Sequence, residues 1–414
     1  MPDSILKINK ATLIGQVKVS GAKNSALRLL AASLLSAGKI EISNFPTNLL
    51  DIKLHLEMLE ALGKSISSQN DSVSITEERK LNENLIWDGR SIRNTLLILG
   101  ALTTRFGKGS VPLPGGCKLG DRKYDLHIML LEKLGAKVWE ENGYLFTEAP
   151  GGLIGSDIHL PIRSTGATEN GIICGTLAKG KTTIWNPHVR PEILDLVKML
   201  NKMGARIRVY GNKCIEITGV ESLQGVRHKV IPDNMEAITW AIASAITGGD
   251  IEILNFPFEH LEVPMVFLRE SGMKFFKGEK SVVVKGSTPF PIEISTGPYP
   301  GINSDMQPLF AVYGACSEGI SKIIDLRFPG RYGYAEELGK MGLNYQTEGD
   351  LLIIKGGTPF VGSKVKALDL RAEMALLLAG LTAEGETTIE EAWQIERGYE
   401  NLIPKLQNLG VSIS

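Results

Sequence analysis

A cysteine lies in a charged, glycine-rich stretch of the chain, PLPGGCKLGDRKYDLH, at residues 112–127. Cysteine is usually buried, so a thiol beside Lys118 and Arg122 calls for a chemical explanation. Nearby positive charge favours the thiolate form of a cysteine. Cys117 is therefore a candidate nucleophile or proton donor. The alternative is an incidental loop thiol that takes no part in chemistry.

Two polar residues, Lys23 and Asn24, come just before an apolar helix pattern in VSGAKNSALRLLAA. Free backbone N–H groups and the helix dipole favour an anion at the start of a helix. A lysine there strengthens such a site. The alternative is a solvated charge beside an asparagine that caps the helix.

A carboxylate and four arginines interrupt or precede other apolar helix patterns. Asp305, in GINSDMQPLF, could cap a helix or act as a general base. An arginine in such a place is costly unless it meets an anion, because the guanidinium group stays charged. One of them could form a structural ion pair, but four together indicate a small ligand with phosphate and carboxylate groups. The four are Arg93, Arg331, Arg371 and Arg397.

The other motifs of the chain argue against cofactor and metal chemistry. Cys174, Cys214 and Cys316 lie in apolar or strand-like patterns and are expected in the core. The four cysteines show no CxxC spacing, so neither a disulfide framework nor a zinc site is expected. The sequence holds no HExxH, GxxxxGK[ST] or GxGxxG motif. We therefore expect no metal ion and no cofactor.

Bulk composition indicates a soluble cytoplasmic protein with reduced thiols. Apolar residues make up 43% of 414 residues, enough for a sizeable core. Lys and Arg (45) nearly balance Asp and Glu (46), so no overall charge attracts nucleic acid or a membrane surface. No run reaches the roughly 18 to 20 apolar residues of a membrane span. The first residues lack the layout of a signal peptide.

An internal repeat must position the candidate residues. Phrases such as LEMLEALGKSI and VKMLNKMGARI recur six times, each with a glycine after an amphipathic helix pattern. The glycines lie 72, 69, 68, 70 and 68 residues apart, beginning at Gly63 and ending at Gly410. Each should adopt a left-handed helix cap and be followed by a short strand. The full set is Gly63, Gly135, Gly204, Gly272, Gly342 and Gly410.

Upstream of most copies lies a helix pattern of small and apolar residues, as in AIASAITGGDIEILNFP. Such a helix is apolar all round and should be buried. The repeated unit is thus strand, buried helix, strand, exposed helix and strands. Six units favour an α/β fold of two domains, each a closed prism of three units with its apolar helices inside. A linear solenoid is the alternative, but its common repeats have only roughly 20 to 50 residues.

The motifs VSGAKNSAL, LPGGCKLGDRKYDLH, STGATEN, SDMQ, DLRA and ERGYE, in this order, resemble those of the UDP-N-acetylglucosamine enolpyruvyl transferases. The resemblance runs from about residue 5 to the C-terminus. It implies an inside-out α/β prism with two domains, one at residues 22–230 and the other at 1–21 plus 231–414. The active site is then expected in the cleft between them, with the Cys117 loop as a mobile lid. The shikimate-pathway enolpyruvyl transferases share the repeat but lack the GGC loop and the AKN motif.

The same resemblance implies a reaction and a role for each candidate residue. The family transfers the enolpyruvyl group of phosphoenolpyruvate to the 3-hydroxyl of UDP-N-acetylglucosamine and releases phosphate, the first committed step of peptidoglycan synthesis. Cys117 resembles the acid that protonates phosphoenolpyruvate, and Asp305 the group beside the sugar hydroxyl. Phosphoenolpyruvate is expected at Lys23, Arg93, Arg122, Arg331, Arg371 and Arg397. The nucleotide sugar is expected at Asn24, Arg122, Asp125, Leu126, His127, Ser164, Gly166, Ser304 and Asp305.

Several positions depart from the family pattern on the nucleotide-sugar side, whereas Asp233 and Glu236 preserve a family pair of acids. Transfer to another nucleotide or nucleotide sugar is therefore an alternative function, and a silent, ligand-binding paralogue is a third. Retention of Lys23, Cys117, Asp305 and Arg397 argues against the silent paralogue. Only small-molecule partners are expected. The departures are Arg28, Lys123, Tyr124, Arg163, Arg190 and Asn303.

Overall fold

A computed structural model describes residues 4–115 and 123–414 of the chain. The chain forms two compact units. The one that we call the N-unit comprises Gly21–Ile231. The other, the C-unit, comprises Met1–Ser20 and Pro232–Ser414.

The N-unit contains six helices and eleven strands in its described residues. Its helices are α1 (Lys23–Ser33), α2 (Leu50–Leu62), α3 (Thr95–Phe106), α4 (Asp125–Lys133), α5 (Thr165–Gly175) and α6 (Pro191–Lys202). Its strands are β3 (Ile40–Ser43), β4 (Ser65–Gln69), β5 (Ser72–Thr76), β6 (Lys108–Pro112), β7 (Lys137–Glu141), β8 (Tyr144–Glu148), β9 (Asp157–His159), β10 (Lys181–Trp185), β11 (Arg206–Tyr210), β12 (Cys214–Thr218) and β13 (Val226–Lys229).

The C-unit repeats this arrangement. Its helices are α7 (Asn234–Ile246), α8 (Glu262–Glu270), α9 (Gln307–Ala315), α10 (Gly333–Lys340), α11 (Leu370–Gly380) and α12 (Leu402–Asn408), with 3-10 turns η1 (Phe258–His260) and η2 (Ala392–Arg397). Its strands are β1 (Ile5–Ile8), β2 (Ile14–Lys18), β14 (Asp250–Leu254), β15 (Lys274–Lys277), β16 (Ser281–Lys285), β17 (Glu293–Ser295), β18 (Ile320–Ile324), β19 (Asn344–Glu348), β20 (Leu351–Lys355), β21 (Lys364–Lys366) and β22 (Thr387–Glu390).

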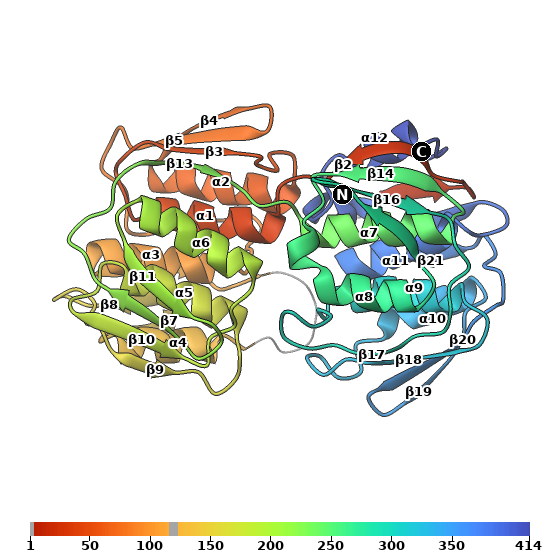
Figure 1. Ribbon diagram of the computed structural model, residues 1–414. Helices are drawn as coiled ribbons and strands as arrows, with labels where there is room; N and C mark the ends of the chain where they lie inside the picture. The colour runs from red at the N-terminus through yellow and green to blue at the C-terminus, as the bar shows by residue number, and fades with distance from the viewer. Residues whose placement is uncertain (1–3, 116–122) are drawn as a thin grey trace. The chain divides into compact units, whose positions relative to one another are not determined.

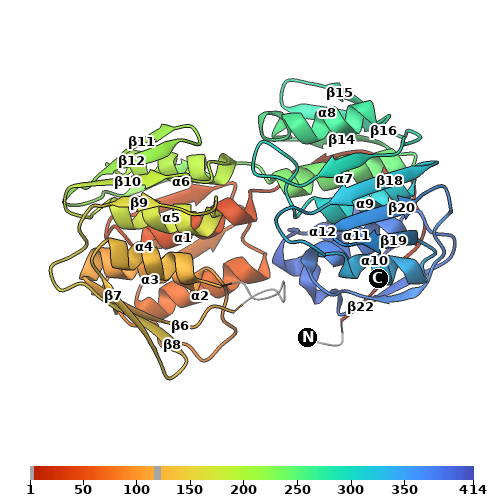
Figure 2. The same cartoon turned by 90° about the horizontal axis from the view of Figure 1, so that it is seen from below.

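Each unit holds three small sheets around a bundle of buried helices (Figure 1). In the N-unit the sheet orders are β13-β3-β5-β4, β6-β8-β7 and β11-β12-β10-β9. In the C-unit they are β15-β16-β14-β2, β17-β18-β20-β19 and β1-β22-β21. Every sheet has an antiparallel strand pair, which is a hairpin in all but β1-β22-β21. Five of the six sheets also have one parallel neighbour, as where Val226 of β13 pairs with Ile40 of β3. Helices α1, α3 and α5, and likewise α7, α9 and α11, lie inside these sheets (Figure 2).

The helices that carry hardly a charge are the buried ones, as their composition predicts. Every residue of α9 and of α11 is buried, and α3 is buried from Thr95 to Thr104. Each unit has its own core, and no residue of one unit belongs to the core of the other. None of the helices in the described residues is long and apolar enough to cross a membrane.

The six repeat glycines end the exposed helices as predicted. Their φ angles are 110° (Gly63), 91° (Gly135), 105° (Gly204), 93° (Gly272), 102° (Gly342) and 91° (Gly410), in the left-handed region that glycine adopts at low cost. The expected strand after the last glycine is the exception. There the chain forms only an isolated bridge from Ile413 to Ile8.

Candidate functional site

In the C-unit, a carboxylate and two arginines meet at the starts of three helices. Asp305 lies in the turn before α9, Arg331 precedes α10, and Arg371 is the second residue of α11. Asp305 Oδ1 is 3.0 Å from Arg331 Nη1, and its Oδ2 is 3.5 Å from Arg371 Nη2. The N-cap of α9 is Met306, so Asp305 is not the cap of that helix. Its backbone N–H donates to Asn303 Oδ1 at 2.9 Å, which fixes the turn.

Both guanidinium groups of this cluster remain charged although they are buried. Burial is the largest single effect and works to lower the pKa of Arg331 and of Arg371, but the surrounding groups together outweigh it and the pKa of each is raised. Asp305 contributes most to this rise at both arginines, with Asp369 adding to it at Arg331 and Tyr399 at Arg371. Arg371 Nη1 is buried and has no hydrogen-bond partner among the described residues. Buried donors nearly always have a hydrogen-bond partner, so this N–H group is available to donate a hydrogen bond to an anionic ligand.

Two further predicted residues of the C-unit, Ser304 and Arg397, belong to the surroundings of this cluster. Ser304 donates to Asp325 Oδ2 at 2.6 Å and accepts a bond from Arg331 Nη1 at 3.3 Å. Arg397 ends η2, which packs against α11, and is 7% exposed. Its Nη1 donates to Gln394 Oε1 at 3.1 Å on the same turn.

In the N-unit, Lys23 is the first residue of α1 and is buried, which excludes the solvated charge considered above. Its Nζ lies 2.6 Å from Asp51 Oδ2 in the first turn of α2, with both side chains mostly covered. The N-cap of α1 is Ala22, so Asn24 does not cap the helix. Sequence reasoning missed Asp51. Its signal in the sequence was an acid directly between apolar residues, in LLDI.

The flank of the cysteine loop is tied to Arg93, which precedes α3. Arg93 Nη2 donates to the carbonyl oxygen of Lys123 at 2.8 Å. Cys117 and Arg122, the central residues of the predicted lid, lie outside the described residues.

The structure brings together two groups of residues predicted for the nucleotide sugar. Asp125, Leu126 and His127 open α4, and Ser164 is the N-cap of α5, its Oγ accepting from Ala167 N at 3.4 Å. A Cβ on Gly166 would lie 2.9 Å from His127 Nε2, so only glycine lets the two helices approach this closely.

His127 is a neutral member of this group. Burial, and then the charge of Arg93, lower the pKa of His127 to about 3. Its Nδ1 is hydrogen-bonded to Asn170 Nδ2 at 3.1 Å. At neutral pH the ring can therefore orient a ligand but cannot offer it a positive charge.

Five of the six departures from the family pattern have a side-chain partner among the described residues, and Lys123 contacts Arg93 through its backbone carbonyl oxygen. Arg28 Nε pairs with Glu169 at 2.6 Å, and Arg190 makes two bonds to Glu192 at 2.7 and 2.8 Å. The remaining contacts are Tyr124 Oη to Glu140, Arg163 Nε to Asn186, and Asn303 to the backbone of Asp305. The family acids also serve local structure, since Asp233 caps α7 and Glu236 accepts from Ser20 N.

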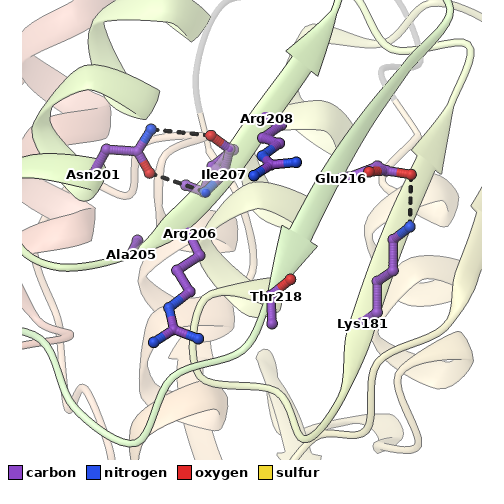
Figure 3. A pocket seen from close by; sticks show the side chains of 8 residues that line it. All are labelled: Lys181, Asn201, Ala205, Arg206, Ile207, Arg208, Glu216 and Thr218. Carbon is purple, nitrogen blue, oxygen red and sulfur yellow. Dashed lines mark hydrogen bonds and ion pairs between the residues drawn. The ribbon is translucent and has the colours of Figure 1, made fainter.

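Other features of the described chain lie away from these groups. Cys174 and Cys214 are buried and Cys316 is partly buried, in agreement with their predicted core positions. No three His, Cys, Asp or Glu side chains of the described residues gather into a group that could hold a metal ion. A hollow of about 630 Å³ lies over strands β10 to β12, where Lys181 pairs with Glu216 (Figure 3), but no predicted site residue lines it.

Six repeated units with helices inside and sheets outside define an α/β prism, and comparison with known proteins identifies its family. The model of the family described as EPSP synthase (3-phosphoshikimate 1-carboxyvinyltransferase) matches residues 8–406, and the chain belongs to this family of enolpyruvyl-transferring enzymes. Within it, the chain is 42% identical to UDP-N-acetylglucosamine 1-carboxyvinyltransferase 1 of Carboxydothermus hydrogenoformans, over 97% of this chain and 95% of the relative. It is 38% identical to UDP-N-acetylglucosamine 1-carboxyvinyltransferase 2 of Mesorhizobium japonicum, over 99% of both chains.

Solved structures agree with the fold. The enolpyruvyl transferase NikO from Streptomyces tendae superposes with a TM-score of 0.91 at 26% identity and covers 100% of this chain and 99% of its own. EPSP synthase from Acinetobacter baumannii superposes with a TM-score of 0.77 at 20% identity, over 99% of both chains. The second likeness supports the architecture alone.

Proposed function

We propose that this protein transfers the enolpyruvyl group of phosphoenolpyruvate to the 3-hydroxyl of UDP-N-acetylglucosamine, with release of phosphate. This reaction is the first committed step of peptidoglycan synthesis. One observation carries the proposal: relatives with this name match the chain at about 40% identity over nearly its full length. Both substrates are small, phosphorylated metabolites, so we propose that the protein works in the cytoplasm and needs no cofactor.

The residues proposed to bind phosphoenolpyruvate are all cationic. Lys23, Arg93 and Arg122 hold its phosphate together with Arg397, and Arg331 and Arg371 lie around its carboxylate and phosphate. Preorganised cations in a dry site stabilise developing charge far better than water does. The unpartnered Nη1 of buried Arg371 supports this role.

The reaction needs one proton donor and one proton acceptor. Cys117 gives a proton to the methylene carbon of phosphoenolpyruvate, which leaves an oxocarbenium-like centre. The sugar 3-hydroxyl attacks that centre while Asp305 takes up its proton. Phosphate then leaves as the Cys117 thiolate takes a proton back from the former methylene carbon, and the enolpyruvyl ether remains. Cys117 can also form a covalent adduct with phosphoenolpyruvate.

The contacts of Asp305 suggest how the bound substrate prepares this base. Its two oxygens are paired with Arg331 and Arg371 in the protein alone. An anionic substrate that binds these guanidinium groups competes for them and leaves the carboxylate less neutralised. A less neutralised carboxylate is a better proton acceptor. Binding of phosphoenolpyruvate would thus favour deprotonation of the acceptor sugar.

The nucleotide sugar is proposed to bind the remaining predicted residues. Neutral His127 orients the ligand rather than countering its charge. The family positions that carry over to this role are Asn24, Arg122, Asp125, Leu126, His127, Ser164, Gly166, Ser304 and Asp305.

Transfer to a different nucleotide or nucleotide sugar is the second candidate function. Its support is the set of departures from the family pattern on the nucleotide-sugar side. However, Arg28 and Arg190 already have carboxylate partners in Glu169 and Glu192. These departures are therefore accounted for without a changed acceptor, and the first proposal is favoured.

Phosphate release with a panel of acceptors tests the proposal. The panel contains UDP-N-acetylglucosamine, other UDP-sugars, UDP and UMP, each with phosphoenolpyruvate. We expect UDP-N-acetylglucosamine to give the highest kcat/KM. No turnover with it, together with turnover of another nucleotide, would establish the second function. A Cys117→Ser variant should lose both turnover and the phosphoenolpyruvate adduct, and retention of both would remove Cys117 from the mechanism.

A further inference from the structure

One buried carboxylate of the N-unit, Asp195 on α6, joins three elements that are far apart in the sequence. Asp195 is 3% exposed. It accepts hydrogen bonds from the hydroxyl of Ser25 on α1, from His228 Nε2 on β13 at 2.8 Å, and from the backbone N–H of Ile231 at 3.4 Å. A carboxylate with three donors is a well-satisfied buried group.

The residue types are those of a hydrolytic triad, but the order of the contacts excludes that chemistry. In a triad the imidazole lies between the hydroxyl and the carboxylate and takes the hydroxyl proton. Here the carboxylate of Asp195 lies between Ser25 and His228. Ser25 is also fully buried, so no substrate can reach its hydroxyl. The network therefore holds structure in place.

The hydrogen-bond network around Asp195 fixes the start of α1. Ser25 is the third residue of that helix, directly after Lys23 and Asn24. On the other side of these two residues, Ala22 N donates to the carbonyl oxygen of Ile231 at 2.8 Å. Asp195 thus fixes Ser25 directly and Ala22 through Ile231.

This start of the helix lacks the usual means of fixing its geometry. Its N-cap is Ala22, which has no side-chain oxygen to accept a hydrogen bond from the first turn. The side chain of Lys23 is fixed at its far end by Asp51. Its backbone end depends on the contacts of its neighbours with Asp195 and Ile231.

We propose that Ser25, Asp195 and His228 are positioning residues that set Lys23 and Asn24 in place for substrate binding. The inference rests on the proposed function, in which Lys23 binds the phosphate of phosphoenolpyruvate. It assigns to the three residues an indirect role, through the backbone of the first turn of α1. Small displacements of a group that binds a reactant reduce rates strongly.

A pair of serine variants on the same helix tests the inference. Ser33 is also buried on α1, and its hydroxyl donates to the carbonyl oxygen of Leu30 at 2.6 Å, far from the first turn. Ser25→Ala and Ser33→Ala each remove one buried hydroxyl and should lower Tm comparably. We expect Ser25→Ala to raise KM for phosphoenolpyruvate about tenfold and Ser33→Ala to leave it unchanged. Equal kinetic effects of the two variants would overturn the inference.

Variants of His228 supply a conservative rescue. His228→Gln keeps an N–H donor for Asp195 and should retain the KM of the unsubstituted protein, whereas His228→Leu should behave as Ser25→Ala does. Because the residues act as one network, Ser25→Ala combined with His228→Leu should cost less than the product of the two single effects. Independent, multiplicative effects would contradict a shared role. If His228→Leu does not fold, the serine pair decides.

Lys23→Ala separates this inference from the proposed function. If Lys23→Ala leaves KM for phosphoenolpyruvate unchanged, the proposed role of Lys23 is wrong and the inference falls with it. If Lys23→Ala raises KM and Ser25→Ala does not, the positioning role is wrong while the proposed function stands.

Discussion

The candidate site depends, residue by residue, on charges that are buried with a partner. Lys23 meets Asp51, and Asp305 meets Arg331 and Arg371, all with most of their surface covered. A buried charge that loses its partner is far more costly than a surface charge that does so. These pairs hold the site in a charged state before any substrate binds.

Replacing Asp51 by asparagine should therefore destabilise the protein and make its stability depend more strongly on bound phosphoenolpyruvate. The buried ammonium group of Lys23 loses its counter-charge, which costs about 3 kcal/mol of unfolding free energy. Because phosphoenolpyruvate can supply a new anionic partner, it should raise the Tm of this variant more than that of the unsubstituted protein. Thermal unfolding with and without phosphoenolpyruvate measures both effects.

Asp250→Asn is the matched control, since it removes the acid of an exposed ion pair with Lys285. It should change stability by less than about 1 kcal/mol and leave the response to phosphoenolpyruvate unaltered. A response of Asp51→Asn no larger than that of the control would contradict the binding role of Lys23.

At the scale of elements, buried polar contacts fix how the exposed helices sit on the inner ones. His55 of α2 is bonded to Asn94, which precedes α3, and His127 of α4 is bonded to Asn170 of α5, both at 3.1 Å. The same pairing thus recurs in two successive repeats. Burial is the main cause that lowers the pKa of each histidine to about 3, with Arg28 adding to the effect at His55 and Arg93 at His127.

Because of these histidines, we expect the free energy of unfolding to decrease as the pH falls below 6.5, the ordinary pKa of histidine. In the folded state they stay neutral down to about pH 3, whereas in the unfolded chain they take up protons near pH 6.5. The unfolded state therefore binds more protons between these values, and lowering the pH favours it. From pH 7 to pH 5 each histidine should cost about 2 kcal/mol.

Urea unfolding between pH 5 and pH 8 measures this slope. His127→Leu should flatten it, while His159→Leu, at an exposed position of β9, should not. An unchanged slope in His127→Leu would show that His127 does not remain neutral in the folded protein.

A close approach of two inner helices, α3 and α5, provides a second prediction at this scale. A Cβ on Gly100 of α3 would lie 1.9 Å from Asn170 Oδ1 on α5. Gly100→Ala should force the helices apart and cost about 3 kcal/mol. Gly151→Ala, where a Cβ meets nothing within 4 Å, is the control and should have nearly no effect. Chemical denaturation of the two variants compares them, and equal stabilities would contradict the tight packing.

At the scale of the whole molecule, the two units have separate cores and different chain organisation. The N-unit is one continuous segment, Gly21–Ile231, whereas the C-unit combines both ends of the chain. A core that draws on one continuous segment contains what a domain needs to fold alone.

We therefore expect a fragment of residues 21–231 to fold by itself. It should show one cooperative thermal transition and a native-like circular dichroism spectrum. A matched fragment of residues 232–414 lacks β1 and β2, which pair with β22 and β14, and should be less cooperative. A molten fragment 21–231 would show that its core needs the C-unit.

The sequence by itself determined the repeat, the buried and exposed helices, and the glycine caps. Each of these follows from a local pattern of apolar residues and from the backbone freedom of glycine. It also indicated the family, because short motifs such as DLRA and ERGYE can be read directly from the sequence. Local patterns, however, say nothing about partners that are distant in the chain.

Only the tertiary structure decided which charges neutralise one another. Asp51 as the partner of Lys23, Glu169 as that of Arg28, and Asp195 as the centre of a network are contacts across 28, 141 and up to 170 residues of sequence. Such pairs form because burial in a low-dielectric core penalises any charge without a partner. The same physics makes Arg28, a departure from the family pattern, one half of an internal ion pair with Glu169.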